Sequence, residues 1–114
     1  MENEKQLIDF TQFLEIESKL EIKYGKITAV EDVPKSDKLI KLTVSFGADD
    51  TRTVVTNIKT ELADSKILLN QGSFFITNLK PAKMMGIESQ AMILPAMHNN
   101  VFVWPLAMIG SKLI

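Results

Sequence analysis

The 114-residue sequence contains no cysteine and only one histidine, His98. Disulfides and thiolate metal sites are therefore excluded, and a single imidazole cannot form a histidine cluster. No apolar run approaches the ~20 residues of a membrane-spanning helix, and the charged start of the chain is unlike a secretory signal. We therefore expect a cytoplasmic protein with no metal site and no cofactor.

Motifs that would support catalysis are also missing. No glycine-rich phosphate loop follows a predicted strand, and no nucleophile elbow occurs. Asp49 and Asp50 fall in a predicted hairpin turn, where paired acids commonly act as turn formers. His98 stands beside two asparagines in a predicted loop, without catalytic partners. We expect that the protein is not an enzyme.

Charge is distributed unevenly, although the net charge is only −1. Residues 1–21 carry six acidic and two basic residues, which gives −4, and residues 22–114 carry eleven basic and eight acidic residues, which gives +3. The main body is thus mildly basic, which permits a polyanion to approach one part of its surface but does not require it.

Hydrophobic periodicity predicts one short helix followed by five strands. Apolar residues recur at helical spacing over residues 6–17, and period-two alternation follows, interrupted by Gly25 in a way that predicts a bulge. Residues 59–69 lack alternation and predict a short helix or loop. The expected strands are residues 20–33, 40–46, 51–58, 72–79 and 89–94.

This order favours an all-β fold, a five-stranded OB-fold barrel with a short N-terminal helix and a C-terminal extension. A β-sandwich is the rival architecture, but a sandwich rarely inserts a helical connection between its third and fourth strands. We expect a single unit in which residues 1–19 form the helical segment and residues 20–114 form the barrel with its extension.

Four stretches resemble a known family, namely "LEIKYGKI", "KSDKL", "NLKPAKMMGIESQAM" and the final "GSKL". They are similar to the tRNA-binding domain of the endothelial monocyte-activating polypeptide type, from about Leu20 to the C-terminus. That domain is appended to methionyl-tRNA synthetases, occurs in the phenylalanyl-tRNA synthetase β subunit, and also exists as free-standing dimeric proteins. The sequence departs from the family at Thr56-Asn57, which replace Ser-Gly, at Ala91, which replaces Gly, and at Met85, where a basic residue is common.

The resemblance implies structure-dependent, sequence-tolerant tRNA binding by a free-standing module, which could assist an aminoacyl-tRNA synthetase in trans. Two alternatives remain open. A sister branch resembles secretion chaperones of the CsaA type, which bind peptides on the same fold. The chain could also be a docking subunit that joins a synthetase.

The motif "NLKPAKMMGIESQAM" supplies the candidate binding residues. Lys80 and Lys83, on a connection shaped by a proline and a glycine, are expected to contact phosphates, whereas Met84, Met85 and Met92 offer polarizable surface for bases. One of the methionine pair could instead plug the barrel, and Ser89 could serve only as a hydrogen bonder at a strand start. The full set of predicted tRNA-binding residues is Asn78, Lys80, Lys83, Ser89, Gln90 and Met92, with Lys35, Lys38 and Arg52 as further contributors.

The C-terminal run "VFVWPLAMIGSKLI" is strongly apolar, and Lys112 is its only charged residue. So much apolar surface is unusual for the tail of a small monomer. In free-standing family members the corresponding extension helps to build a dimer. We therefore expect a homodimer, although a monomer could bury the run against its own barrel.

Overall fold

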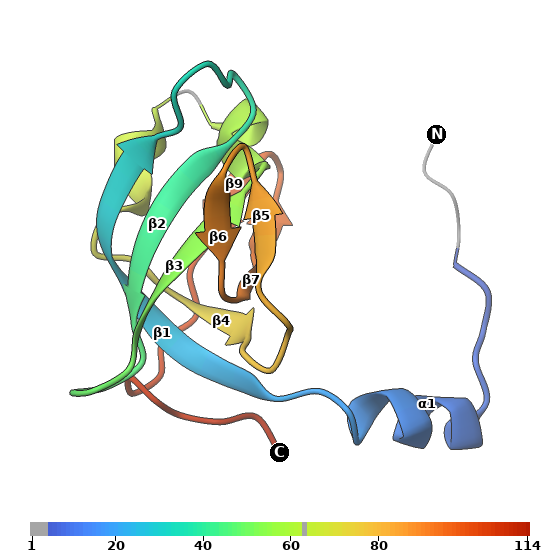
Figure 1. Cartoon of the computed structure of the whole chain (residues 1–114). Coiled ribbons are helices and arrows are strands. Elements are labelled where there is room, and N and C mark those ends of the chain that lie inside the picture. Colours follow the sequence, from blue (N-terminus) through green and yellow to red (C-terminus); the bar gives the residue numbers. More distant parts are fainter. Residues whose placement is uncertain (1–4, 63) are drawn as a thin grey trace.

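One curled antiparallel sheet of five strands forms the body of the molecule (Figure 1). The computed structural model describes residues 5–62 and 64–114. The strand order is β3-β2-β1-β4-β7, and every neighbouring pair is antiparallel. The predicted mostly-β, OB-like architecture is confirmed. The bounds of its strands are β1 Ile22–Asp32, β2 Ile40–Ser45, β3 Thr51–Thr56, β4 Gly72–Ile76 and β7 Met92–Leu94.

The curl of the sheet depends on β1, because this strand changes partner along its length. Residues 22–26 pair with β4, and residues 26–32 pair with β2. A register shift between Ile27 and Ala29 marks the bulge. A bulge increases the local twist of a strand, so the two halves of β1 can pair with two strands, β4 and β2, that lie in different directions.

The predicted bulge in this strand is confirmed, but its predicted position at Gly25 is wrong, since Gly25 pairs regularly with Ser73 on β4. Glycine is needed there because of a close approach. A Cβ atom at this position would lie 2.6 Å from Cγ1 of Val44 and 2.7 Å from a ring carbon of Phe46. The interruption in the alternation therefore marks tight packing across the sheet and not an extra residue.

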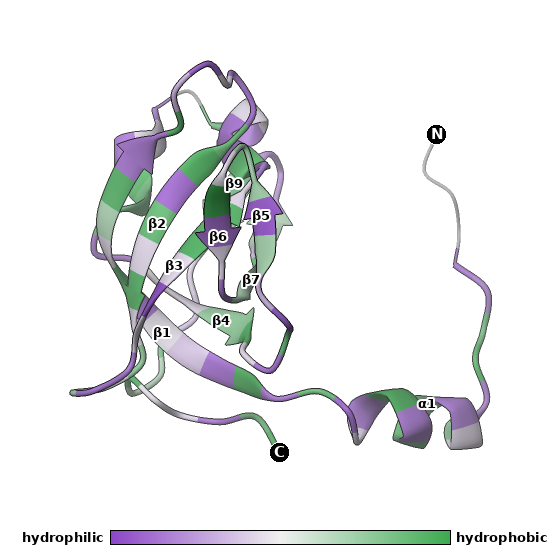
Figure 2. Ribbon diagram, in the orientation of Figure 1, coloured by the Kyte–Doolittle hydropathy of each residue, from purple (hydrophilic) through white to green (hydrophobic). Residues whose placement is uncertain are grey.

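Alternating burial along β2 directs one face of the sheet inward, as the banding of apolar and polar residues along this strand in Figure 2 shows. The second half of β3, Val54 to Thr56, is buried as well. Phe46 and Phe75 meet edge to face in this interior, with ring centroids 5.4 Å apart. Two 3₁₀ helices, η1 Ile58–Glu61 and η2 Ser65–Leu68, connect β3 to β4 as predicted. The buried core consists of Ile27, Ile40, Leu42, Val44, Phe46, Val54, Ile58, Leu68, Phe75, Ala91, Ile93 and Phe102.

Part of the C-terminal run packs against the barrel. It begins with β9 Val101–Val103, which pairs with β8 Ala96–His98 in a hairpin whose two turn residues both have positive φ. His98 therefore ends a strand and is not in a loop as predicted. Phe102 reaches the core and stacks on Trp104 at a centroid distance of 5.6 Å. The end of the chain then runs along β1, where the backbone N–H of Tyr24 donates to Ser111 at 2.7 Å.

The N-terminal helix α1, Phe10–Glu17, projects to one side of the barrel in Figure 1. Its start is fixed by a capping box in which Asp9 and Gln12 exchange hydrogen bonds between side chain and backbone. The helix is therefore four residues shorter at its start than the predicted 6–17. No helix within residues 5–62 and 64–114 is long and apolar enough to cross a membrane.

Candidate nucleic-acid interface

The motif predicted as a shaped connection folds into a small hairpin. Its strands are β5 Ala82–Met84 and β6 Ile87–Ser89, and β6 packs against β3. Met85 and Gly86 form the tip with φ values of 52° and 80°. Such a pair of left-handed residues is typical of a two-residue hairpin turn, which explains the glycine in the motif.

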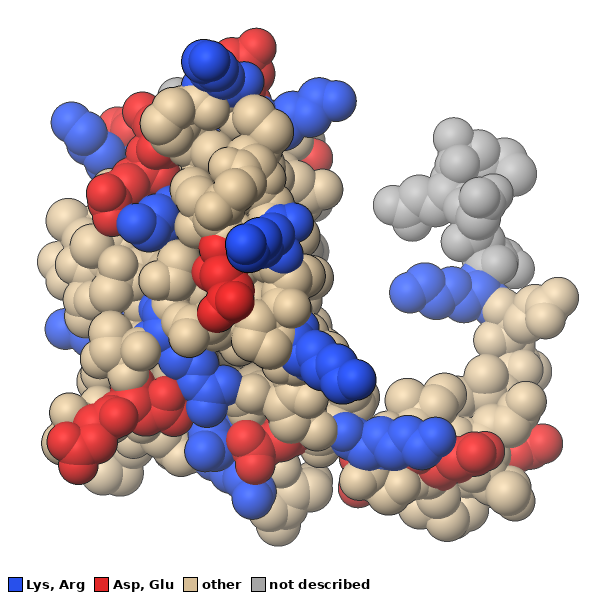
Figure 3. Space-filling view, viewed as in Figure 1, with Lys and Arg blue, Asp and Glu red and all other residues tan. Residues whose placement is uncertain are grey.

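Both lysines of the motif are exposed. Lys83 lies on the outer face of the hairpin, directly across from Glu88 in the strand register, and Lys80 precedes β5. Neither lysine takes part in a salt bridge with any residue that the structure describes. Figure 3 shows basic side chains spread over this face of the molecule, with acidic ones between them. The ammonium groups are thus available to an anionic ligand, and Glu88 moderates the charge of one of them.

A hollow of about 270 Å³ lies behind the hairpin. Met84 and Met92 line it, and Met85 remains at the exposed hairpin tip. Neither residue of the methionine pair belongs to the buried core of the described chain. We name it the methionine hollow, lined by Leu39, Val55, Thr56, Asn57, Met84 and Met92.

A second basic segment borders this hollow. Lys35 and Lys38 are exposed in the loop between β1 and β2, where Lys35 adopts a φ of 65°. The hydroxyl oxygen of Ser36 accepts from the backbone N–H of Leu39 at 3.0 Å, which holds the end of the loop. Because Leu39 lines the methionine hollow, the loop places Lys38 next to its rim.

Ser89 and Gln90 close the barrel along the edge of β3 that has no strand partner in the five-stranded sheet. The buried hydroxyl of Ser89 accepts from the backbone N–H of Val55 at 2.9 Å and donates to the carbonyl of Ala91 at 3.1 Å. The side-chain oxygen of Gln90 accepts from the N–H of Thr53 at 2.8 Å, and the N–H of Gln90 donates to the Thr53 carbonyl at 2.8 Å. These side chains satisfy an edge that would otherwise be unpaired.

Asn78 joins the N-terminal segment to the connection that carries the lysines. Its Oδ1 accepts from the backbone N–H of Glu21 at 2.8 Å, and its Nδ2 donates to the carbonyl of Lys19 at 2.7 Å. Both ends of the amide are thus engaged within the protein. Asn78 therefore holds these two segments together, two residues before Lys80 in the sequence.

Arg52 is held within the fold by several contacts. Its guanidinium donates to both carboxylate oxygens of Asp50, at 2.8 and 3.1 Å, and to the carbonyl of Thr77 at 2.6 Å, and it lies over the Phe46 ring. The hydrogen bond from Arg52 lowers the pKa of Asp50 below its usual value. This cation is less available to a ligand than the exposed lysines.

A carboxylate beside Arg52 extends this network. Glu21 accepts from the Thr77 hydroxyl at 2.7 Å and forms longer ion pairs with Lys23 at 3.7 Å and Lys112 at 3.9 Å. The hydrogen bond from Thr77 lowers the pKa of Glu21, and the neighbouring cations act in the same direction. The network pairs three cations, Arg52, Lys23 and Lys112, with the two carboxylates, and it joins the tail to the start of β1.

Sequence reasoning missed the polar rim of the hollow. Thr56 and Asn57 were noted only as departures from the family pattern, yet both line the methionine hollow. Asn57 also precedes η1 without capping it through its side chain. The available signal was an asparagine in a position where the family has glycine.

Within the described ranges, no group of three or more His, Cys, Asp or Glu residues is arranged to hold a metal ion.

Comparison with known proteins matches this sequence to one family. The family model described as "Putative tRNA binding domain" matches residues 22–106, which include β1, the hairpin and the methionine hollow. The methionine–tRNA ligase of Methanospirillum hungatei is 46% identical over 88 residues, which cover 77% of this chain and 13% of the ligase. The chain spans only 11–14% of the length of the first curated ligases that it matches.

Solved structures share the whole fold. A MetRS-related protein from Pyrococcus horikoshii superposes with a TM-score of 0.77 at 29% identity, over 96% of this chain and 100% of that one. The chaperone CsaA of Bacillus anthracis superposes with a TM-score of 0.71 at 22% identity, over 96% and 100% of the two chains. The second likeness concerns the fold alone.

Proposed function

The chain belongs to the tRNA-binding domain family, and we propose that it binds tRNA through the exposed face formed by the β5–β6 hairpin and the β1–β2 loop. The observation that carries this proposal is the position of Lys80 and Lys83. Both are exposed, take part in no salt bridge with a described residue, and lie within the region that the family model matches.

The binding recognises folded shape and backbone and tolerates differences in sequence. Lys80 and Lys83, together with Lys35 and Lys38, neutralise phosphates, while the methionine hollow accepts sugars or bases through apolar contact. Arg52 contributes through the fold and through the electrostatic field of the domain, since each of its three guanidinium nitrogens already donates a hydrogen bond within the protein. Asn78, Ser89 and Gln90 act chiefly by holding this surface in register.

No chemical step is part of the proposed function. Binding in this manner would allow the domain to retain tRNA near an aminoacyl-tRNA synthetase, acting in trans as a free-standing module. The synthetase relatives match the chain over a small part of their own length, which supports a binding accessory. A cytoplasmic setting follows from the same proposal.

Titration of labelled tRNA at several salt concentrations tests the proposal. If about three to five phosphates are neutralised, the logarithm of the association constant falls with the logarithm of salt at a slope of roughly −2 to −4. Duplex and single-stranded RNA of equal length should bind more weakly, because they lack the folded shape. Salt-independent binding, or tight capture of an unfolded apolar peptide with no capture of tRNA, would favour the CsaA-like chaperone function instead.

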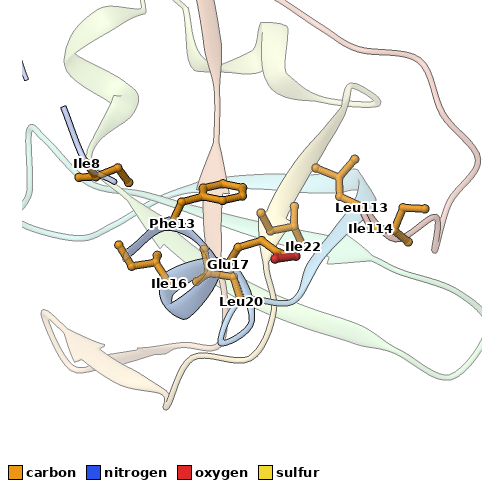
Figure 4. A pocket seen from close by; sticks show the side chains of 8 residues that line it. All are labelled: Ile8, Phe13, Ile16, Glu17, Leu20, Ile22, Leu113 and Ile114. Carbon is orange, nitrogen blue, oxygen red and sulfur yellow. The ribbon is translucent and has the colours of Figure 1, made fainter. Parts of the chain in front are cut away.

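A homodimer is a second part of the proposal, and one surface favours it. A hollow of about 290 Å³ lies between α1, the start of β1 and the chain end, as Figure 4 shows, and its lining is almost wholly apolar. Phe13, Ile16 and Ile114 line it and remain exposed. The predicted apolar tail therefore supplies only part of the surface, since Phe102 is buried in the core.

A second copy is the simplest partner for this surface, because pairing about a two-fold axis closes the assembly. Light scattering at micromolar concentration should return twice the chain mass of 12.8 kDa. Phe13→Glu should return the single mass without changing the circular dichroism of the barrel. A monomer at all concentrations would refute the dimer and leave a synthetase as the partner to be tested at this surface.

A further inference from the structure

A second hollow, of about 460 Å³, adjoins the methionine hollow. The two share Asn57, so an RNA strand that crosses the first can reach the second. The volume lies within the range of roughly 300–1,000 Å³ that is usual for small-molecule sites. We name it the glutamate hollow, lined by Asn57, Ile58, Thr60, Glu61, Pro95, Met97 and Phe102.

The charge of the glutamate hollow is unsuited to phosphate. Its described lining includes the carboxylate of Glu61 and no lysine or arginine. The neighbouring Lys59 is occupied by a salt bridge to Asp32, with Nζ and Oδ1 3.0 Å apart. An RNA phosphate would therefore be repelled, whereas an uncharged group that donates hydrogen bonds would be attracted.

The polar atoms of the hollow suit one edge of one nucleobase. Guanine is the only RNA base whose Watson–Crick edge presents two adjacent donors, N1–H and N2–H, beside an acceptor, O6. A carboxylate has two oxygens that can accept such a pair, and the Asn57 amide, which makes no cap bond to η1, can donate to O6. Pro95 and Met97 offer an apolar wall for the flat ring.

We propose that the glutamate hollow receives one unpaired guanine of the bound RNA, which donates from N1 and N2 to the carboxylate of Glu61. The inference rests on the proposed tRNA binding and adds one base preference to contacts that otherwise follow the backbone. RNA-binding proteins commonly read bases that are splayed out from loops in this manner. Uracil, with one donor between two acceptors, is rejected by the same carboxylate.

Kethoxal probing of a tRNA pool tests the inference, because this reagent modifies the N1 and N2 positions of unpaired guanine. Reverse-transcription stops should show one unpaired guanine protected in the complex with the unaltered protein. In the Glu61→Gln complex that guanine should react again, and affinity should fall about five- to tenfold, because one charged bidentate acceptor is lost. The salt slope should stay unchanged, since no phosphate contact is removed.

Glu88→Gln is the matched control, since it makes the same substitution on the hairpin, outside the hollow. It should leave the protection in place and strengthen binding slightly, because it removes the acid across from Lys83. Absence of any protected guanine in a salt-sensitive complex, or protection that persists in Glu61→Gln, would overturn the inference and leave the proposed function intact. Failure of every tRNA to bind would refute both.

Discussion

Two basic regions of the same barrel use their positive charge in opposite ways. Around the hairpin, Lys80 and Lys83 are exposed and take part in no salt bridge with a described residue. At the other region, the Arg52 guanidinium is held by Asp50, and Lys23 pairs with Glu21. The first arrangement leaves charge for a ligand, and the second uses it to fix strands and tail. Basic residues in a sequence therefore do not indicate by number alone where a polyanion binds.

The largest expected effect comes from removing the exposed pair. Lys80→Ala with Lys83→Ala should reduce tRNA affinity about ten- to hundredfold and flatten the salt slope by about two, since each lysine accounts for about one phosphate. Fluorescence anisotropy at three or more salt concentrations measures both values. All tRNAs should be affected alike.

The matched control removes two lysines from the paired region. Lys23→Ala with Lys112→Ala makes the same change in net charge, yet it should alter affinity less than about threefold and leave the slope nearly unchanged, because both ammonium groups face Glu21. Equal effects of the two double variants would abolish the distinction between the regions.

The next effect concerns the seam that supports the hairpin. Ser89→Ala leaves the buried N–H of Val55 without its acceptor, which should cost about 1–2 kcal/mol of unfolding free energy and lower Tm by several degrees. Thermal unfolding followed by circular dichroism measures this loss. Binding should weaken with an unchanged salt slope. Ser45→Ala, whose hydroxyl makes only a 3.4 Å contact, should stay within about 0.5 kcal/mol of the unaltered protein.

Ser89 also illustrates which features of the structure could be predicted from the sequence and which could not. Alternation predicted β2 nearly to the residue, because the strand is long enough to show its period. The β-branched residues after a turn predicted β3 nearly as well. The three-residue strands β5 and β6 show no period, so their pairing was not predicted. The motif identified Ser89 and Asn78 as important residues, but it did not indicate which groups their side chains bind.

The reason is that the partners of these side chains are distant along the chain. Ser89 accepts from a residue 34 positions away, and Asn78 donates to one 59 positions away. Such pairs exist only once the barrel has closed. Local propensity is informative about elements and turns, whereas the target of a polar side chain depends on topology.

A smaller effect is expected from the guanidinium of the paired region. Arg52→Lys keeps the charge but cannot reproduce the fork that joins Asp50 to the Thr77 carbonyl. The expected cost is about 1 kcal/mol in urea unfolding, with tRNA affinity and salt slope unchanged. A loss of affinity without a loss of stability would instead place Arg52 among the phosphate contacts.

The smallest effect is the response of the paired region to acid. The pKa values of Glu21 and Asp50 are lowered in the folded protein from ordinary values of 4.5 and 3.8. Their contribution to stability is complete above these values. As pH falls below them, the unfolded chain takes up protons first, so stability is lost until pH passes the lowered folded-state pKa values. Glu21→Gln with Asp50→Asn should flatten the decline of the urea midpoint below pH 4.5, whereas Lys80→Ala with Lys83→Ala should leave it intact. If both double variants flatten it equally, the hairpin lysines are paired in solution, and the contrast between the two regions fails.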